Sequence, residues 1–217
     1  MENEKQIAGE KAVDYIEEGM TIGLGTGSTV YYTILKIGEM VKKGLKIKAV
    51  STSSRTTELA QSLGINVLPI DSVETIDLAI DGADEIDKDF NAIKGGGGAL
   101  LYEKIVASLA KQVIWIVDSS KIVKKLGKFP LPVEIVPFGY THTIKDFQNA
   151  GMNPILRQKD GKLFITDSGN YIVDLHLDEI DKPHELSIFL NSKPGVVENG
   201  LFLKMSHLVI VGRVFVA

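Results

Sequence analysis

The pattern of apolar and polar residues predicts alternating strands and helices through the first 128 residues. Apolar residues recur at helical spacing over 4–18, and Gly19 follows that segment. Further along, short apolar runs alternate with helical patterns. The predicted strands are 21–24, 46–50, 65–70, 76–80 and 113–117, and the predicted helices are 30–41, 54–63 and 100–110. Strands that alternate with helices form right-handed βαβ units around a mainly parallel sheet, so the fold class is α/β.

The pattern changes after Lys128, where Pro130 and Pro132 mark a boundary. Beyond it we predict strand 133–136, helix 144–150, strand 154–158, a turn at 159–161, strands 162–166 and 170–177, and helix 184–191. This order of strands and helices, with hairpins, is typical of a smaller α+β domain. The apolar run 208–211 can return to the first sheet. We therefore expect one domain from 1–128 with about 204–217, and a second from 129–203.

Composition and charge exclude several classes of protein. The net charge of −4 and the pI of about 5.6 argue against a nucleic-acid or membrane-surface partner. No apolar run is long enough to span a membrane, and the charged start lacks the apolar stretch of a signal peptide. The expected location is the cytoplasm. With no cysteine and four scattered histidines, we expect neither a disulfide nor a metal site.

A first glycine loop, Gly23-Leu-Gly-Thr-Gly-Ser-Thr29, joins a predicted strand to a predicted helix. A dinucleotide fingerprint needs a glycine where Ser28 stands and an acid after the next strand. That strand ends instead in the hydroxyl-rich segment 51–54. NAD binding is therefore not favoured. The backbone N–H groups and hydroxyls of this loop can surround a phosphate, although a plain capped helix start is the alternative.

Polar residues also follow two neighbouring strands. The segment 51–54 comes after strand 46–50, and Asp81 and Asp84 come after strand 76–80. In a parallel sheet the carboxyl ends of the strands form one crevice, so we expect these hydroxyls to converge with the first glycine loop. An N-cap formed by Ser53 or Ser54 is compatible with that role. Turn chemistry is the alternative explanation for the two aspartates.

The densest polar stretch is a run of four glycines, Gly95–Gly98, preceded by Lys94. Consecutive glycines raise the entropic cost of folding, so such a loop usually serves close backbone approach or an unusual conformation. The loop opens a predicted helix, which makes it a candidate anion site. Glu103 lies in the first turns of that helix. Acids, a lysine and an anion cradle together indicate catalysis on a phosphorylated small molecule.

These residues resemble ribose-5-phosphate isomerase of the A type. The segments that carry the resemblance, in order along nearly the whole chain, are 23–29, 81–86, 93–100 with Glu103, 118–121, 127–134 and 194–202. Tyr102 differs from the basic residue of several members. The resemblance implies a Rossmann-like domain with a small α+β domain, no cofactor, and assembly as a homodimer or homotetramer.

The resemblance also implies a reaction and a set of residues. The reaction interconverts D-ribose 5-phosphate and D-ribulose 5-phosphate in the non-oxidative branch of the pentose phosphate pathway. Glu103 would be the base. The implied substrate-binding residues are Thr26, Gly27, Ser28, Thr29, Asp81, Gly82, Ala83, Asp84, Lys94, Gly95, Gly96, Gly97 and Lys121, and the implied catalytic residues are Glu103, Asp81, Asp84 and Lys94.

The residue types suit this chemistry. One carboxylate can move a proton between C2 and C1 through an enediol, as a glutamate does in triosephosphate isomerase. Lys94 and the glycine N–H groups can face the negative oxygen of the enediolate. Asp81 or Asp84 can move protons on the sugar oxygens during ring opening. The alternatives are a non-catalytic sugar-phosphate sensor, which would not need Glu103 and Lys94, and a protein-binding module, which would leave the polar loops unexplained.

Overall fold

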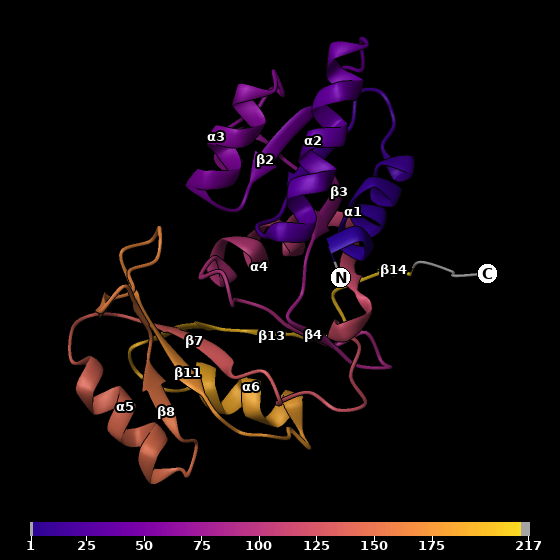
Figure 1. The fold of residues 1–217 in the computed structure, drawn as a ribbon. Helices are drawn as coiled ribbons and strands as arrows, with labels where there is room; N and C mark the ends of the chain where they lie inside the picture. Colours follow the sequence, from indigo (N-terminus) through magenta and orange to yellow (C-terminus); the bar gives the residue numbers. More distant parts are fainter. Residues whose placement is uncertain (1, 214–217) are drawn as a thin grey trace. The chain divides into compact units, whose positions relative to one another are not determined.

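A five-stranded parallel sheet forms the centre of the first of two units into which the chain divides (Figure 1). The computed structural model describes residues 2–213. The first unit contains the chain up to Ala83, residues 102–122 and the chain from Met205 onward, and the second contains residues 84–101 and 123–204. Residues 214–217, which the expected first domain includes, lie outside the described residues.

The strand order of the parallel sheet is β14-β6-β3-β1-β2. These strands are β1 (Thr21–Leu24), β2 (Lys48–Ser51), β3 (Ile76–Asp81), β6 (Ala110–Asp118) and β14 (Leu208–Gly212). Every ladder between them is parallel. The prediction of a mainly parallel sheet is therefore confirmed, as is the return of the last apolar run to it.

Helices of the first unit lie on both faces of the sheet. They are α1 (Glu2–Lys11) with the short 3₁₀ helix η1 (Ala12–Tyr15), α2 (Ser28–Lys42), α3 (Ser54–Ser62) and α4 (Leu100–Leu109). Ile22 and Leu24 of β1 belong to one core cluster with residues of α1 and α2. Between them, a Cβ at Gly23 would lie 2.6 Å from Val106 of α4. Because side chains alternate along a strand, α4 packs on the face opposite α1 and α2.

Several predicted elements differ from the structure. The strand 65–70 is wrong: a single bridge joins Ala49 to Val67, and η2 (Ile70–Ser72) follows Pro69. The Leu68 amide still donates to the Ala49 carbonyl at 2.8 Å, and pairing stops because the chain leaves the extended conformation at Ile70. The strand 162–166 shortens to β10 (Lys162–Leu163), which pairs only with β9 (Gln158–Lys159). The helix 4–18 becomes α1 and η1, because its last turn tightens into a 3₁₀ helix.

The second unit contains a four-stranded antiparallel sheet with two helices. Its strand order is β12 (Val196–Asn199), β7 (Leu131–Ile135), β11 (Tyr171–Leu175) and β8 (Pro154–Leu156), and its helices are α5 (Tyr140–Asn149) and α6 (Pro183–Asn191). Inward residues of β7 and β11 form a core with Phe147 of α5 and Leu190 of α6. This is the α+β arrangement that the sequence pattern predicts for the chain after Lys128.

A three-stranded sheet of short strands also belongs to the second unit. It consists of β13 (Leu201–Phe202), β5 (Ala92–Ile93) and β4 (Glu85–Ile86). The sequence pattern placed residues 84–128 in the first domain, whereas 123–128 and the longer segment 84–101 group with the second unit. The pairing of β5 with β13, from a distant part of the chain, is the physical reason for this difference. None of the helices among the described residues is long and apolar enough for a membrane span.

Two phenylalanines test the core of the second unit. Phe147 is 0% exposed and Phe138 is 94% exposed. Replacing Phe147 with alanine should lower the free energy of unfolding by about 3–5 kcal/mol, because it removes buried apolar surface and leaves a cavity. The matched change Phe138→Ala should stay within about 0.5 kcal/mol. Denaturant titrations followed by circular dichroism make the comparison. Equal losses in the two variants would contradict this packing.

Candidate active site

Three loops of the first unit meet at the carboxyl edge of its sheet. The hydroxyl of Thr26, after β1, lies 2.7 Å from the Thr52 hydroxyl and donates to the Ser53 hydroxyl at 2.8 Å. Ser53 also accepts the Thr56 amide at 3.2 Å and so caps α3. The predicted convergence of the two hydroxyl-bearing loops and the predicted N-cap are both confirmed. The Thr26 hydroxyl therefore ties the loops together.

Asp81 connects the third loop to the first. It is 4% exposed, and its Oδ1 accepts the Thr26 amide at 3.1 Å and the Gly82 amide at 2.7 Å. The carboxyl group fills the space beside Gly25, where an added Cβ would lie 2.5 Å from the Cβ of Asp81. A glycine is needed at position 25 because any larger residue would displace the carboxylate.

Glu103 lies in the first turn of α4, as the sequence predicts, and is 5% exposed. A carboxylate there is favoured by the positive end of the helix dipole. Glu103 and Asp81 line the same narrow gap, which is too small to hold a water molecule. The other residues around this gap are Gly23, Gly25, Thr52, Ala79, Val106, Ala107 and Trp115. The structure thus brings two of the predicted catalytic carboxylates together.

The start of α2 is open to solvent. Gly27 and Ser28 are exposed, and Gly27 has a φ of 136°, which favours glycine. Among the described residues, no side chain caps this helix at Gly27. The first N–H groups of an α-helix lack partners within the helix. Thr29, the next residue, is buried. The exposed turn at 27–28 therefore has the geometry of an anion-binding helix start.

Lys121 ends the short 3₁₀ helix η3 (Ser119–Lys121), directly after β6. Asp118 caps this turn by accepting the Ser120 amide at 3.0 Å. Glu4 accepts both the amide and the hydroxyl of Ser119 at 2.7 Å. These hydrogen bonds, the backbone one first, hold the pKa of Glu4 below its ordinary value. The turn that carries the half-buried Lys121 is therefore held by hydrogen bonds at Ser119 and Ser120.

Lys94 is a buried lysine of the second unit. Its side chain is 2% exposed, and its Nζ lies 5.3 Å from the centroid of the Phe202 ring. The Lys94 amide donates to the Gly200 carbonyl at 2.9 Å, which extends the pairing between β5 and β13. An aromatic face favours a nearby cation, and a buried ammonium needs such compensation. The backbone and the ring therefore fix this lysine in place.

Asp84 and the glycine run are joined by a hydrogen bond. Asp84 Oδ2 accepts the Gly96 amide at 2.8 Å. The run forms a turn in which the Gly98 amide donates to the Gly95 carbonyl at 3.0 Å. Gly95 has a φ of 108°, a conformation that other residues rarely adopt. The glycines are therefore needed for the shape of a tightly held loop.

Two residues that sequence reasoning did not select hold this loop within the second unit. Glu85 is 4% exposed and accepts the amides of Gly127 at 2.8 Å and Phe129 at 2.7 Å. The Phe129 ring lies against Gly96, where an added Cβ would be 2.9 Å from it. Arg157 donates to the carbonyl oxygens of the glycine run. Arg157 lies outside the segments that carry the resemblance, and Glu85 lies within one of them, 81–86, but its partners Gly127 and Phe129 are distant in the sequence.

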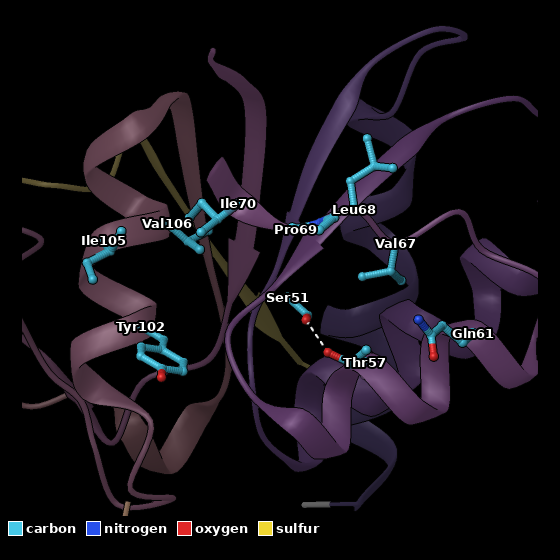
Figure 2. Close-up of a pocket in the computed structure, with 10 residues that line it drawn as sticks. All are labelled: Ser51, Thr57, Gln61, Val67, Leu68, Pro69, Ile70, Tyr102, Ile105 and Val106. Atoms are coloured by element: carbon cyan, nitrogen blue, oxygen red, sulfur yellow. Dashed lines mark hydrogen bonds between the residues drawn. The ribbon is translucent and has the colours of Figure 1, made fainter. Parts of the chain in front are cut away.

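A cavity of about 490 Å³ lies elsewhere in the first unit, between α3 and α4 (Figure 2). Figure 2 shows Tyr102 on α4 and a hydrogen bond of 2.5 Å between the hydroxyls of Ser51 and Thr57. The remaining lining residues are Gln61, Val67, Leu68, Pro69, Ile70, Ile105 and Val106. None of the predicted catalytic or substrate-binding residues lines it. Its walls are mainly apolar, unlike the polar loops described above.

The predicted residues thus fall into two sets. Thr26–Thr29, Asp81–Ala83, Glu103 and Lys121 belong to the first unit, and Asp84 and Lys94–Gly97 belong to the second. Within residues 2–213, no group of three or more acids and histidines has the geometry to hold a metal ion. The fold and these polar loops define an α/β protein with two buried carboxylates, a buried lysine and a helix N-terminus of the kind that binds phosphate.

Comparison with known proteins makes the assignment specific. The model of the family Ribose 5-phosphate isomerase A (phosphoriboisomerase A) matches residues 48–214. Ribose-5-phosphate isomerase A of Streptococcus uberis is 52% identical over 212 residues, which cover 97% of this chain and 94% of the relative. The chain belongs to the ribose 5-phosphate isomerase A family.

Solved structures agree with this family. A D-ribose-5-phosphate isomerase in complex with phospho-erythronic acid has a TM-score of 0.92 and 41% identity, and the match covers 96% of this chain and 93% of that one. The ribose 5-phosphate isomerase of Plasmodium falciparum has a TM-score of 0.93 and 39% identity, with 97% and 94% covered. The Rossmann-like α/β fold expected from the resemblance is confirmed.

The contact between Gly25 and Asp81 can be tested by Gly25→Ala. The added methyl group should displace the Asp81 carboxylate and lower the free energy of unfolding by about 1–3 kcal/mol, as overpacking does. Gly82→Ala is the matched control, because a Cβ there would meet its nearest atom at 3.8 Å. Denaturant titration and a crystal structure of each variant measure the effect. An unmoved Asp81 with unchanged stability would show that the space beside Gly25 is not filled.

Proposed function

We propose that this chain interconverts D-ribose 5-phosphate and D-ribulose 5-phosphate through an enediolate intermediate. The family assignment over nearly the whole chain supports this reaction, which belongs to the non-oxidative branch of the pentose phosphate pathway. The observation that carries the mechanism is the buried carboxylate of Glu103, which lines one narrow gap with Asp81.

In this mechanism Glu103 removes the proton from C2 of the open-chain aldose and returns it to C1. A single carboxylate can serve both carbons because they are adjacent, and the same group is base in one half of the reaction and acid in the other. Burial keeps the glutamate away from bulk water. Its position in the first turn of α4 places the carboxylate on a regular element of the fold, where its backbone is fixed.

Lys94 would stabilise the enediolate oxygen, where negative charge appears as the proton leaves. The buried ammonium is fixed in advance by the backbone pairing at Gly200 and by the Phe202 ring. A preorganised cation in a site with little water lowers the energy of the transition state more than that of the ground state. The exposed Gly97 would supply a backbone N–H group nearby in the chain.

The phosphate would bind at the start of α2, where the turn 27–28 is exposed and the helix has no side-chain cap among the described residues. Lys121 would add a positive charge. Asp81 or Asp84 would move protons during ring opening. Asp81 has one oxygen already committed to two amides, and Asp84 accepts the Gly96 amide. Both carboxylates are therefore rigidly oriented, and the choice between them stays open.

The test of this function is an assay of ribulose 5-phosphate formed from ribose 5-phosphate by the purified protein, with EDTA present. We expect turnover that chelation leaves unchanged. Binding without turnover would favour a sugar-phosphate sensor instead. A cytoplasmic location and assembly as a homodimer or homotetramer stay predictions. Size-exclusion chromatography with light scattering tests the oligomeric state.

Replacing Glu103 with glutamine should lower kcat by about 10²–10⁴-fold, the usual contribution of a positioned general base. The amide has nearly the same shape, so substrate binding and the fold should persist. The exposed Glu58 of α3 gives a matched control, Glu58→Gln, with unchanged kcat. Steady-state kinetics measures both. Wild-type turnover in Glu103→Gln would exclude Glu103 as the base and make Asp81 the leading candidate.

Lys94→Ala should lower kcat and kcat/KM together by about 10²–10³-fold, because the interaction forms mainly in the transition state. Phospho-erythronic acid, which is bound in the related isomerase structure, carries a carboxylate that mimics the enediolate. Its affinity should fall in the same variant. Lys162→Ala, at an exposed position of β10, is the control. A change confined to KM would identify Lys94 as a substrate anchor.

A further inference from the structure

Arg157 of the second unit forms an ion pair with Asp174, and the rest of its guanidinium group contacts the glycine run. Its Nε donates to Asp174 Oδ2 at 2.8 Å, and its Nη2 pairs with Asp174 Oδ1. The two side chains are 13% and 18% exposed. Its remaining terminal nitrogen, Nη1, donates to the Gly95 carbonyl at 2.7 Å and to the Gly96 carbonyl at 3.2 Å.

The peptide between Gly95 and Gly96 is consequently held at both ends. Its carbonyl accepts from Arg157, and its N–H donates to Asp84 Oδ2 at 2.8 Å. No peptide bond among the described residues is cis, so this carbonyl and this N–H point in opposite directions. A continuous chain of hydrogen bonds therefore runs from Asp174 through Arg157 and this peptide to Asp84.

Packing closes the same loop from a second side. The ring of Phe164 stacks near Arg157, with 5.8 Å between the guanidinium carbon and the ring centroid. The edge of that ring lies where a Cβ at Gly98 would be. The same ring therefore lies beside both the guanidinium and the glycine turn. Hydrogen bonds that share a peptide group in this way polarise one another.

We infer that Arg157 is a positioning residue of the reaction, which acts by fixing the peptide at Gly95–Gly96 and, through it, the carboxylate of Asp84. This inference rests on the proposed isomerase function. The positive guanidinium on the carbonyl oxygen strengthens the N–H on the other side of the peptide as a donor to Asp84. The same contact at the Gly96 carbonyl orients the following peptide, whose N–H belongs to Gly97.

Lysine cannot replace this arginine. The guanidinium makes two hydrogen bonds to Asp174 and reaches the glycine carbonyls at the same time, because its donors lie in a rigid plane. A lysine ammonium keeps the charge but has no such fork. Arg157→Lys should therefore retain the fold and the charge while the peptide and Asp84 lose their fixed orientation.

The test compares Arg157→Lys, Arg157→Ala and Asp174→Asn with wild type and with Arg213→Lys, a matched change at an exposed arginine. We expect Arg157→Lys and Asp174→Asn to melt near wild type. Both should lower kcat by about 10–100-fold, the effect of a small misplacement of reacting groups. KM for ribose 5-phosphate should change by less than about threefold, because these variants remove little binding of the ground-state substrate. Arg213→Lys should match wild type.

Chemical rescue separates positioning from mere support of the fold. Added guanidinium chloride, at concentrations that do not denature the protein, should raise kcat of Arg157→Ala several-fold, while ammonium chloride at equal ionic strength should not. Unchanged kcat in Arg157→Lys would overturn the positioning role of Arg157 but not the isomerase function. A loss of kcat that only parallels a lower melting temperature, and that guanidinium does not restore, would do the same. An inactive wild type would overturn the isomerase function first and this role with it.

Discussion

The polar loops of the first unit depend on one constraint, the register of the three parallel strands β1, β2 and β3. Leu24 of β1 pairs with Ser51 of β2 and with Ile80 of β3, so these strands end in step. Their following loops are therefore delivered to the same edge of the sheet. Thr26, Thr52 and Asp81 then meet by hydrogen bonds within and between those loops. A slip of the register by one residue would separate these groups and reverse the faces of each strand.

A second constraint explains why so many glycines surround the candidate site. At Gly25 the Asp81 carboxylate occupies the space of a side chain, and at Gly98 the Phe164 ring does so. The glycines thus allow close approach, and the surrounding hydrogen bonds then remove the freedom that glycine would otherwise keep. Rigid orientation of the peptide groups follows, which is the condition for electrostatic stabilisation of a transition state.

Local patterns predicted much of this arrangement. The alternation of apolar runs with helical periods gave the parallel sheet, and the residues at strand ends indicated where Asp81 and the Thr26 loop would meet. The position of Glu103 in the first turn of α4 followed from the glycine run before it. In these cases the information lies within a few residues along the chain.

Local sequence patterns did not predict contacts between residues that are distant in the sequence. The pairing of β5 with β13 groups residues 84–101 with the second unit, although their apolar pattern continues that of the first. Arg157 contacts Gly95 and Asp174, and Glu85 contacts Gly127, and in each case the partner is distant in the sequence. The predicted strand 65–70 ended after the bridge at Val67 because the chain enters the 3₁₀ helix η2 at Ile70. Three-dimensional proximity alone identifies these residues.

In the proposed mechanism, one carboxylate carries the proton between C2 and C1 through an enediolate. Isomerisation in D₂O, followed by NMR through many turnovers, tests it most directly. A carboxylate base exchanges its proton with solvent in some turnovers, so deuterium should accumulate at C1 of ribulose 5-phosphate and at C2 of ribose 5-phosphate. Full interconversion with no deuterium at either carbon would indicate direct hydride transfer and would contradict the mechanism.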